Sequence, residues 1–240
     1  MDVRSVGLVS LYGALVLFTP KTSYAHVALP GYSGLMSTPN ADVLPQRQLA
    51  ISFGWLNGPQ TYLFAPLTNR LYVISVGLLP GLEVTIRQTQ VIGWHDPEAP
   101  GVQHAFDRMV SAKYAFSLPE RFPKLAVGIQ DLASVNFLTN VSGVKPGMTQ
   151  YDQSTIYGVI GDKHDYWHWH LGVGISQAFI NGPFAGISFH PSESFGILGE
   201  WDSRRLNFGG RLSPFRELWI QASILDQKTL GIIRGLLTPL

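Results

Sequence analysis

The sequence predicts an all-β protein, an antiparallel up-and-down transmembrane β-barrel of about 10–12 strands. Apolar residues occupy every second position in four consecutive short segments between Phe184 and Ile224, which is the period of a strand whose side chains alternate between two faces. The 25 glycines and 16 prolines interrupt the chain at short intervals, and no long segment repeats its apolar residues with helical spacing. Charged residues make up only 14% of the chain, which is fewer than soluble domains usually carry.

The N-terminal 25 residues have the pattern of a secretory signal peptide. Arg4 precedes an apolar stretch at residues 6–18, which is too short to span a bilayer, and the small-residue ending Ser23-Tyr24-Ala25 follows. The alternative is a buried N-terminal helix. We expect three regions: a signal peptide at 1–25, an irregular N-terminal segment at 26–47 and an outer-membrane β-barrel at 48–240.

From residue 48 onward, twelve segments fit the strand pattern. In chain order they are Gln48–Leu56, Leu71–Leu79, Leu82–Ile92, Arg108–Ser117, Lys124–Ser134, Asp152–Ile160, Tyr166–Gln177, Phe184–His190, Ser194–Asp202, Arg205–Ser213, Glu217–Leu225 and Lys228–Leu236.

The two faces of each predicted strand differ in polarity. In 205–212, for example, Leu206 and Phe208 share one face, and Asn207 and Arg211 share the other. A soluble β-sandwich with its apolar face inward would show the same alternation. The low charge content, and polar faces rich in Gly, Ser and Thr, favour a barrel whose apolar face meets lipid and whose polar face lines the lumen.

These faces supply two sets of candidate residues. Buried charges need partners, so the charged residues of the polar faces form a candidate lumenal polar network. Its members are Glu83, Arg87, Lys113, Glu200, Asp202, Arg205 and Arg211. Aromatic residues gather toward strand ends, where membrane barrels carry interfacial girdles. The candidate aromatic girdle consists of Trp55, Trp94, Trp167, Trp201 and Trp219.

The connections also have the character of an outer-membrane barrel. Very short ones, such as Pro80-Gly81 and Ser203-Arg204, contrast with longer ones at 93–107 and 135–151. The closing strand is the exception. Ile232 and Ile233 are adjacent in a poorly alternating segment, and the chain ends on Leu240 rather than on an aromatic residue. Either the barrel closes unusually, or another chain or segment completes it.

Several chemistries find no support in the sequence. The chain has no cysteine, which excludes disulfides and thiolate chemistry, and no basic run suggests nucleic acid. There is no Gly-x-Ser-x-Gly motif. His168 and His170 lie about 7 Å apart on one strand face, too far to share a metal ion. A cross-strand pair such as Ser188 with His170 stays open. We expect no catalytic residue, no metal and no cofactor.

An ordered series of segments resembles one family. Residues 31–42 read Gly-Tyr-Ser-Gly-Leu-Met-Ser-Thr-Pro-Asn-Ala-Asp, and residues 48–53 read Gln-Leu-Ala-Ile-Ser-Phe. Together with 79–87, 125–132, and 184–191 leading to 198–202, they resemble YjbH-type exopolysaccharide proteins, over roughly residues 31–230. Members of that family are often far longer, so the chain resembles a short, single-barrel member. The resemblance implies a Gram-negative outer-membrane β-barrel with a part in the production or export of an extracellular polysaccharide.

We therefore expect a non-catalytic outer-membrane β-barrel that takes part in exopolysaccharide production or export, located in the outer membrane after cleavage of its signal peptide. The expected partners are outer-membrane lipid, exopolysaccharide and other secretion-system proteins, and not nucleic acid. Two alternatives stay open. One is a secreted soluble β-sandwich that binds glycans through exposed aromatics, with Trp167 and Trp169 inside its core. The other is an outer-membrane lipid-modifying enzyme.

Overall fold

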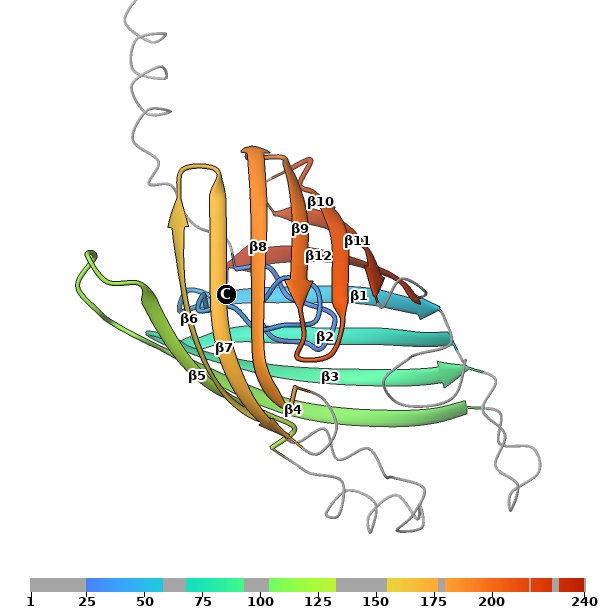
Figure 1. Cartoon of the computed structure of the whole chain (residues 1–240). Coiled ribbons are helices and arrows are strands. Elements are labelled where there is room, and N and C mark those ends of the chain that lie inside the picture. Colours follow the sequence, from blue (N-terminus) through green and yellow to red (C-terminus); the bar gives the residue numbers. More distant parts are fainter. Residues whose placement is uncertain are drawn as a thin grey trace, which may run out of the picture.

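A computed structural model of the chain describes residues 25–57, 68–92, 104–132, 155–176, 180–215, 217–225 and 229–239. Its strands form one sheet that closes on itself in the order β1-β12-β11-β10-β9-β8-β7-β6-β5-β4-β3-β2, with antiparallel neighbours (Figure 1). The strands are β1 (Gln48–Asn57), β2 (Thr68–Leu79), β3 (Leu82–Ile92), β4 (His104–Phe116), β5 (Lys124–Gln130), β6 (Thr155–His164), β7 (Trp167–Ser176), β8 (Gly182–Ser192), β9 (Phe195–Trp201), β10 (Leu206–Leu212), β11 (Leu218–Leu225) and β12 (Thr229–Pro239).

The predicted fold class is confirmed, because the sheet is a closed antiparallel barrel of consecutive strands. In the part of the chain that the structure describes, no helix is long and apolar enough to cross a membrane. The predicted signal peptide, apart from Ala25, lies outside the described residues, as do Trp94 and most of the two longer predicted loops.

The barrel closes on its own chain. β1 and β12 pair from Gln48–Pro239 to Asn57–Leu230, so no other segment is needed to complete the wall. β12 alternates poorly because its inward face is apolar as well. Ile233 points inward, is fully buried and belongs to an apolar cluster with Leu29 and Met36 of the N-terminal segment.

The two ends of the barrel differ in their connections. The short connections 80–81, 165–166 and 193–194 lie at one end, called here the turn end, together with the start of β1 and the end of β12. The ends of β1, β3 and β5 and the starts of β2, β4 and β6 lie at the opposite end, called here the loop end, as does the short connection 202–205. β1 therefore begins, and β12 ends, at the turn end.

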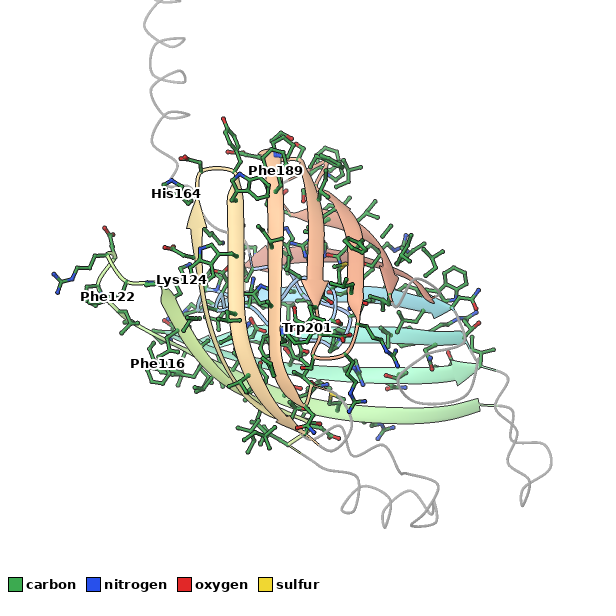
Figure 2. The ribbon with its side chains drawn as sticks, viewed as in Figure 1. Phe116, Phe122, Lys124, His164, Phe189 and Trp201 are labelled. Carbon is green, nitrogen blue, oxygen red and sulfur yellow. The ribbon has the colours of Figure 1, made fainter. Side chains whose placement is uncertain are left out.

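Apolar side chains point outward from the barrel, as the alternation predicts (Figure 2). On β7 the outward row is Trp167, Trp169, Leu171, Val173 and Ile175, with exposed fractions from 38% to 75%. The inward positions of the same strand include His170 and Ser176, both buried. This arrangement excludes the β-sandwich, in which Trp167 and Trp169 would lie in the core.

Residues 25–44 lie inside the barrel, and the exposed residues 45–47 connect them to β1; the segment 25–47 is called here the plug (the blue segment in Figure 1). Residues 27–39 are all buried. The segment folds on itself through isolated bridges between Val27 and Ser33 and between Gly34 and Pro39. A Cβ atom on Gly34 would lie 2.2 Å from the Thr38 carbonyl oxygen, so this tight turn requires glycine.

Of the predicted girdle, Trp55, Trp167 and Trp201 point outward from strand ends. The prediction for Trp219 is wrong. Its side chain is only 1% exposed and points inward, where its ring lies over Gly235 of the neighbouring strand and edge-on to His26 of the plug. The reason is strand parity, since Trp219 shares a face with the buried Gln221 and Ser223.

Candidate functional site

Two pairs of charged side chains on the barrel wall bind the plug backbone, and each pair is called here a clamp. The first clamp consists of Glu83 and Lys113, which are register partners on β3 and β4. The Glu83 carboxylate accepts the backbone N–H groups of Ser33 and Leu44, both at 2.8 Å, and the Ser33 hydroxyl. The Lys113 ammonium donates to the carbonyl oxygens of Ser33 at 2.7 Å and Asn40 at 3.3 Å. The acid and the base therefore hold the N–H and the C=O of the same plug residue.

The second clamp consists of Glu200 on β9 and Arg211 on β10. Glu200 accepts the backbone N–H groups of Met36 at 3.0 Å, Ser37 at 2.8 Å and Thr38 at 3.2 Å, together with the hydroxyls of Ser37 and Thr38. Arg211 donates through Nη2 to the carbonyl oxygens of Gly34 at 3.3 Å and Leu35 at 3.1 Å. Five successive plug residues, 34–38, are thus held by one carboxylate and one guanidinium.

The sequence predicts that the lumenal charges pair with one another, but the plug backbone is their principal partner. Arg87 also binds the plug backbone, because it donates to the carbonyl oxygen of Pro30 at 3.2 Å. Asp202 lies in the turn after β9, where it accepts the backbone N–H of Arg205 at 2.9 Å. Five of the predicted network residues therefore meet at the plug, whereas Asp202 and Arg205 lie in a loop-end turn.

Both clamps compensate the free-energy cost of burying ionised side chains. An ionised side chain in a dry interior is tolerated only with several hydrogen bonds, and hydrogen bonds to charged groups are about twice as strong as neutral ones. Glu83 and Glu200 are 1% and 3% exposed, yet each carboxylate is surrounded by plug donors. The plug supplies these donors because its irregular backbone leaves its N–H groups outside any sheet.

A third attachment joins the end of the plug to β5 and β6. Asp42 binds Lys124 at 2.7 Å and Lys163 at 3.0 Å. Burial alone would raise the pKa of Asp42, but the two ammonium groups outweigh burial and hold that pKa well below its ordinary value. Because Lys124 is half exposed, solvent screens this attachment more than it screens the buried clamps.

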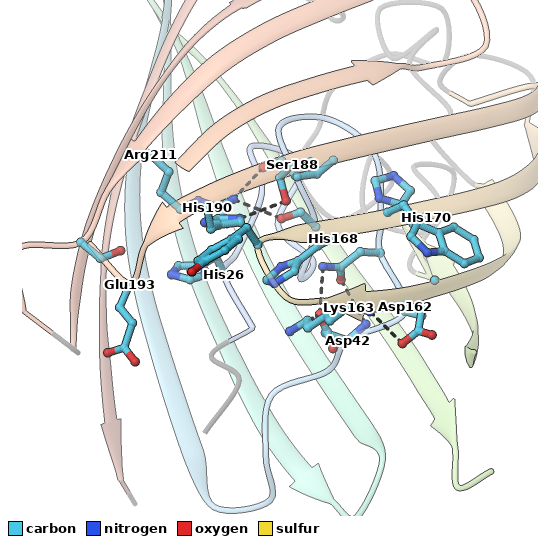
Figure 3. A pocket seen from close by; sticks show the side chains of 18 of the residues that line it. His26, Asp42, Asp162, Lys163, His168, His170, Ser188, His190, Glu193 and Arg211 are labelled. Carbon is cyan, nitrogen blue, oxygen red and sulfur yellow. Dashed lines mark hydrogen bonds and ion pairs between the residues drawn. The ribbon is translucent and has the colours of Figure 1, made fainter. Parts of the chain in front are cut away.

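A cavity of about 910 Å³ opens between the plug and the inner wall of β6 to β10, toward the turn end (Figure 3). It is called here the turn-end cavity. His168 and His190 line it with their ring centroids 4.7 Å apart, and His190 Nε2 lies 3.0 Å from the Ser188 hydroxyl. The other histidine considered for Ser188 is engaged elsewhere, because His170 Nε2 lies 2.9 Å from the Thr38 hydroxyl of the plug.

The cavity does not have the ligand set of a metal centre. Among the described residues, no group of three His, Cys, Asp or Glu side chains is placed to hold a metal ion. Nor could the plug residues have been identified as functional from strand patterns, because they belong to no strand. The only available signal was the motif at 31–42, which contains most of the residues that the two clamps hold.

These features define a class of protein, a closed antiparallel β-barrel of the outer-membrane type with an internal plug. The family model described as YjbH, exopolysaccharide biosynthesis protein YbjH, matches residues 28–137. This match confirms the resemblance predicted from the sequence. It covers nearly all of the plug, strands β1 to β5, and therefore the whole first clamp.

Solved structures that resemble the chain are also barrels, at low sequence identity. An outer membrane channel from Pseudomonas putida F1 has 9% identity and a TM-score of 0.45, covering 84% of this chain and 99% of that one. The calcium-bound outer membrane phospholipase dimer of Salmonella typhi has 7% identity and a TM-score of 0.45, covering 79% and 89%. Outer membrane phospholipase A from Escherichia coli has 7% identity and a TM-score of 0.41, covering 80% and 96%. No curated protein matches the sequence.

Proposed function

We propose that this protein is a non-catalytic outer-membrane barrel that takes part in exopolysaccharide production or export in a Gram-negative bacterium, and that it works as a plugged scaffold. The observation that carries the proposal is the clamped plug. The plug and the first clamp lie within the portion that matches the exopolysaccharide family, so the feature that closes the lumen is also part of the family likeness.

The outward surface supports a lipid environment. Exposed apolar side chains lie on the outside of each strand from β7 to β11, whereas a soluble monomer rarely exposes such a large apolar area. Charges on this surface are sparse. Arg234 of β12 is one, and its guanidinium lies 5.8 Å from the ring centroid of Phe53. Such cation–π contact compensates part of the cost of a lipid-facing charge.

The plugged lumen supports a scaffold role over that of an open pore. The inward face is occupied by the plug and its clamps, and each clamp holds backbone groups that would otherwise be unsatisfied. A polymer chain could pass through the barrel only after these contacts were exchanged. In this state the barrel instead offers partners its turn-end surface and its lipid-embedded wall.

Location and role are tested by two measurements on the native host. Membrane fractionation with a heat-modifiability gel should recover a folded barrel in the outer membrane. Deletion of the gene should reduce surface exopolysaccharide, and wild-type protein should restore it. Recovery in the soluble periplasm would contradict the location, and unchanged exopolysaccharide in the deletion strain would contradict the role.

The non-catalytic assignment has its own test, because Ser188 and His190 lie at a distance seen in serine nucleophile–base pairs. A fluorophosphonate probe should leave the purified protein unlabelled. Covalent labelling that Ser188→Ala abolishes would instead identify a hydrolase.

A further inference from the structure

We propose that the turn-end cavity binds an acidic sugar chain through a carboxylate group. The inference rests on the proposed function for the nature of the polymer. It rests on the structure for the charge and the position of the site, which lies at the turn end beside the plug and not along the lumen axis that the plug closes.

The first argument is a continuous row of hydrogen-bond donors on the inner wall. Lys163 of β6 is the register partner of His168 on β7, which is in turn the partner of Ser188 on β8. The His190 ring occupies the space where a side chain on Gly196 would be, and Gly196 is the register partner of Arg211. Four of the five neighbouring strands β6 to β10 thus bring an ammonium, two imidazoles, a hydroxyl and a guanidinium to one wall of the cavity (Figure 3).

The second argument is the charge of that wall. Arg211 is only 6% exposed, and its hydrogen bonds go to the neutral oxygens of Gln221, Gly34 and Leu35; among the described residues it forms no ion pair. Lys124 and Lys163 both bind the carboxylate of Asp42, and Lys124 is half exposed. Away from the mouth, the lining therefore holds the cations Lys163 and Arg211 and the carboxylate Asp42, and a bound anion would add to the negative charge that Glu200 already supplies near the buried guanidinium.

The remaining acids lie at the mouth. Asp162, Asp165 and Glu193 line the cavity but are exposed to solvent, where water screens their repulsion of an incoming anion. The aromatic rings of Tyr166 and Phe215, 58% and 67% exposed, also line the mouth. Exposed aromatic rings provide flat, amphipathic surfaces for the apolar face of a sugar ring.

The size and composition of the cavity favour a sugar over a lone anion. Its volume of about 910 Å³ lies in the range of about 300–1,000 Å³ that is typical of sites for organic ligands. A small inorganic anion would contact only part of the donor row and neither aromatic ring. A carboxylate-bearing oligosaccharide can reach both the donors inside and the rings at the mouth.

The test is calorimetric titration of the purified barrel in detergent with three probes: an oligogalacturonate, a neutral maltooligosaccharide of equal length, and inorganic phosphate. We expect the oligogalacturonate to bind at least about tenfold more tightly than either of the others, since one charge-assisted hydrogen bond corresponds to about that factor. Equal binding of both oligosaccharides would overturn the charge argument. Equal binding of phosphate would show a site for a free anion instead.

The paired substitution His168→Gln with His190→Gln should weaken oligogalacturonate binding at least about tenfold, because two donors of the row are changed. His164→Gln is the matched control, since His164 is an exposed turn-end histidine outside the cavity, and it should bind as wild type does. A heat-modifiability gel checks folding, and Ser188→Ala replaces the double variant if that variant does not fold. Unchanged affinity in the folded variant would overturn the site.

The two proposals fail separately. Binding without any exopolysaccharide defect in the deletion strain would remove the proposed function and leave an anionic-glycan site. A defect in the deletion strain without binding of the oligogalacturonate would remove the site and leave the function.

Discussion

Replacing Glu200 by glutamine tests how strongly the second clamp holds the plug. Oε2 of Glu200 accepts the N–H groups of Met36 and Thr38, while Oε1 accepts the N–H of Ser37 and the amide of Asn207. A glutamine side chain has one acceptor oxygen and one NH2 donor. In the better of its two orientations, the glutamine oxygen keeps the hydrogen bonds from the N–H groups of Met36 and Thr38. The N–H of Ser37 then faces the glutamine NH2 group, which is also a donor.

The cost follows from these contacts. One unsatisfied buried N–H costs about 1–3 kcal/mol, and the two remaining bonds each lose about 1 kcal/mol when the acceptor is no longer charged. The total destabilisation of the docked plug is about 3–5 kcal/mol. Since about 1.4 kcal/mol is a factor of ten, the population of the undocked plug should rise about 100-fold or more.

The absence of native cysteine makes the assay specific. A single cysteine at the buried plug position Ala28 would be labelled by a maleimide only when the plug undocks. When undocking and redocking are fast, the labelling rate follows the undocked population. We expect Glu200→Gln to accelerate labelling of Ala28→Cys about 100-fold, and the matched control Glu193→Gln, an exposed turn-end glutamate, to leave the rate unchanged.

The folded barrel must be present in each variant, which a heat-modifiability gel establishes. If folded Glu200→Gln labels at the rate of the parent protein, the six donors around the carboxylate do not hold the plug, and the reasoning on both clamps is refuted. A rate increase in Glu193→Gln of the same size would show that loss of any nearby charge has this effect.

Three further outcomes are expected. The Asp42 pKa lies below its ordinary value of 3.8, so the stability that the Lys124 and Lys163 contacts give the docked plug is fully present above pH 3.8 and is lost only as the pH falls further. The ratio of plug labelling rates between Asp42→Asn and its parent should therefore stay constant from about pH 7 to pH 5. A changing ratio would contradict the assignment. Gly235→Ala places a Cβ 2.0 Å from the Trp219 ring and should destabilise the barrel by about 1–3 kcal/mol, which a lower heat-modification temperature would show. The control Gly199→Ala places its Cβ no closer than 3.9 Å to any other atom and should leave that temperature unchanged. Leu171→Arg on the outward face of β7 should cost about 2–4 kcal/mol in urea unfolding from liposomes, unlike Leu171→Phe; equal midpoints would place that face out of lipid.

The barrel wall was predictable because strand periodicity is a local property. Each residue of β10 is assigned to a face by its parity alone, and the exposed Phe208 and buried Asn207 lie as the alternation requires. Parity also places Trp219 inward, whereas its position near a strand end predicts an interfacial residue. Gly235 on the neighbouring strand has no side chain and therefore leaves room for the large inward ring of Trp219.

The plug was not predictable from such patterns, because nothing in residues 25–47 specifies which surface they meet. Their contacts with Glu200 span more than 160 residues of sequence, and no periodicity reports on contacts at that range. Parity identifies the charges of the clamps as lumenal, but it does not identify their partners. A backbone N–H is present at almost every residue, so the sequence does not show which N–H groups bind a charged side chain.

The two clamps also differ in when they can form as the chain folds. The contact of Glu83 with Ser33 closes a segment of 50 residues, whereas the contact of Glu200 with Met36 closes one of 164, and loop closure becomes more costly as the loop lengthens. The first clamp can form on β3 and β4 alone, before β12 has met β1. The plug would then be carried on a half-built sheet, and the final β1–β12 pairing would enclose a segment that is already in place.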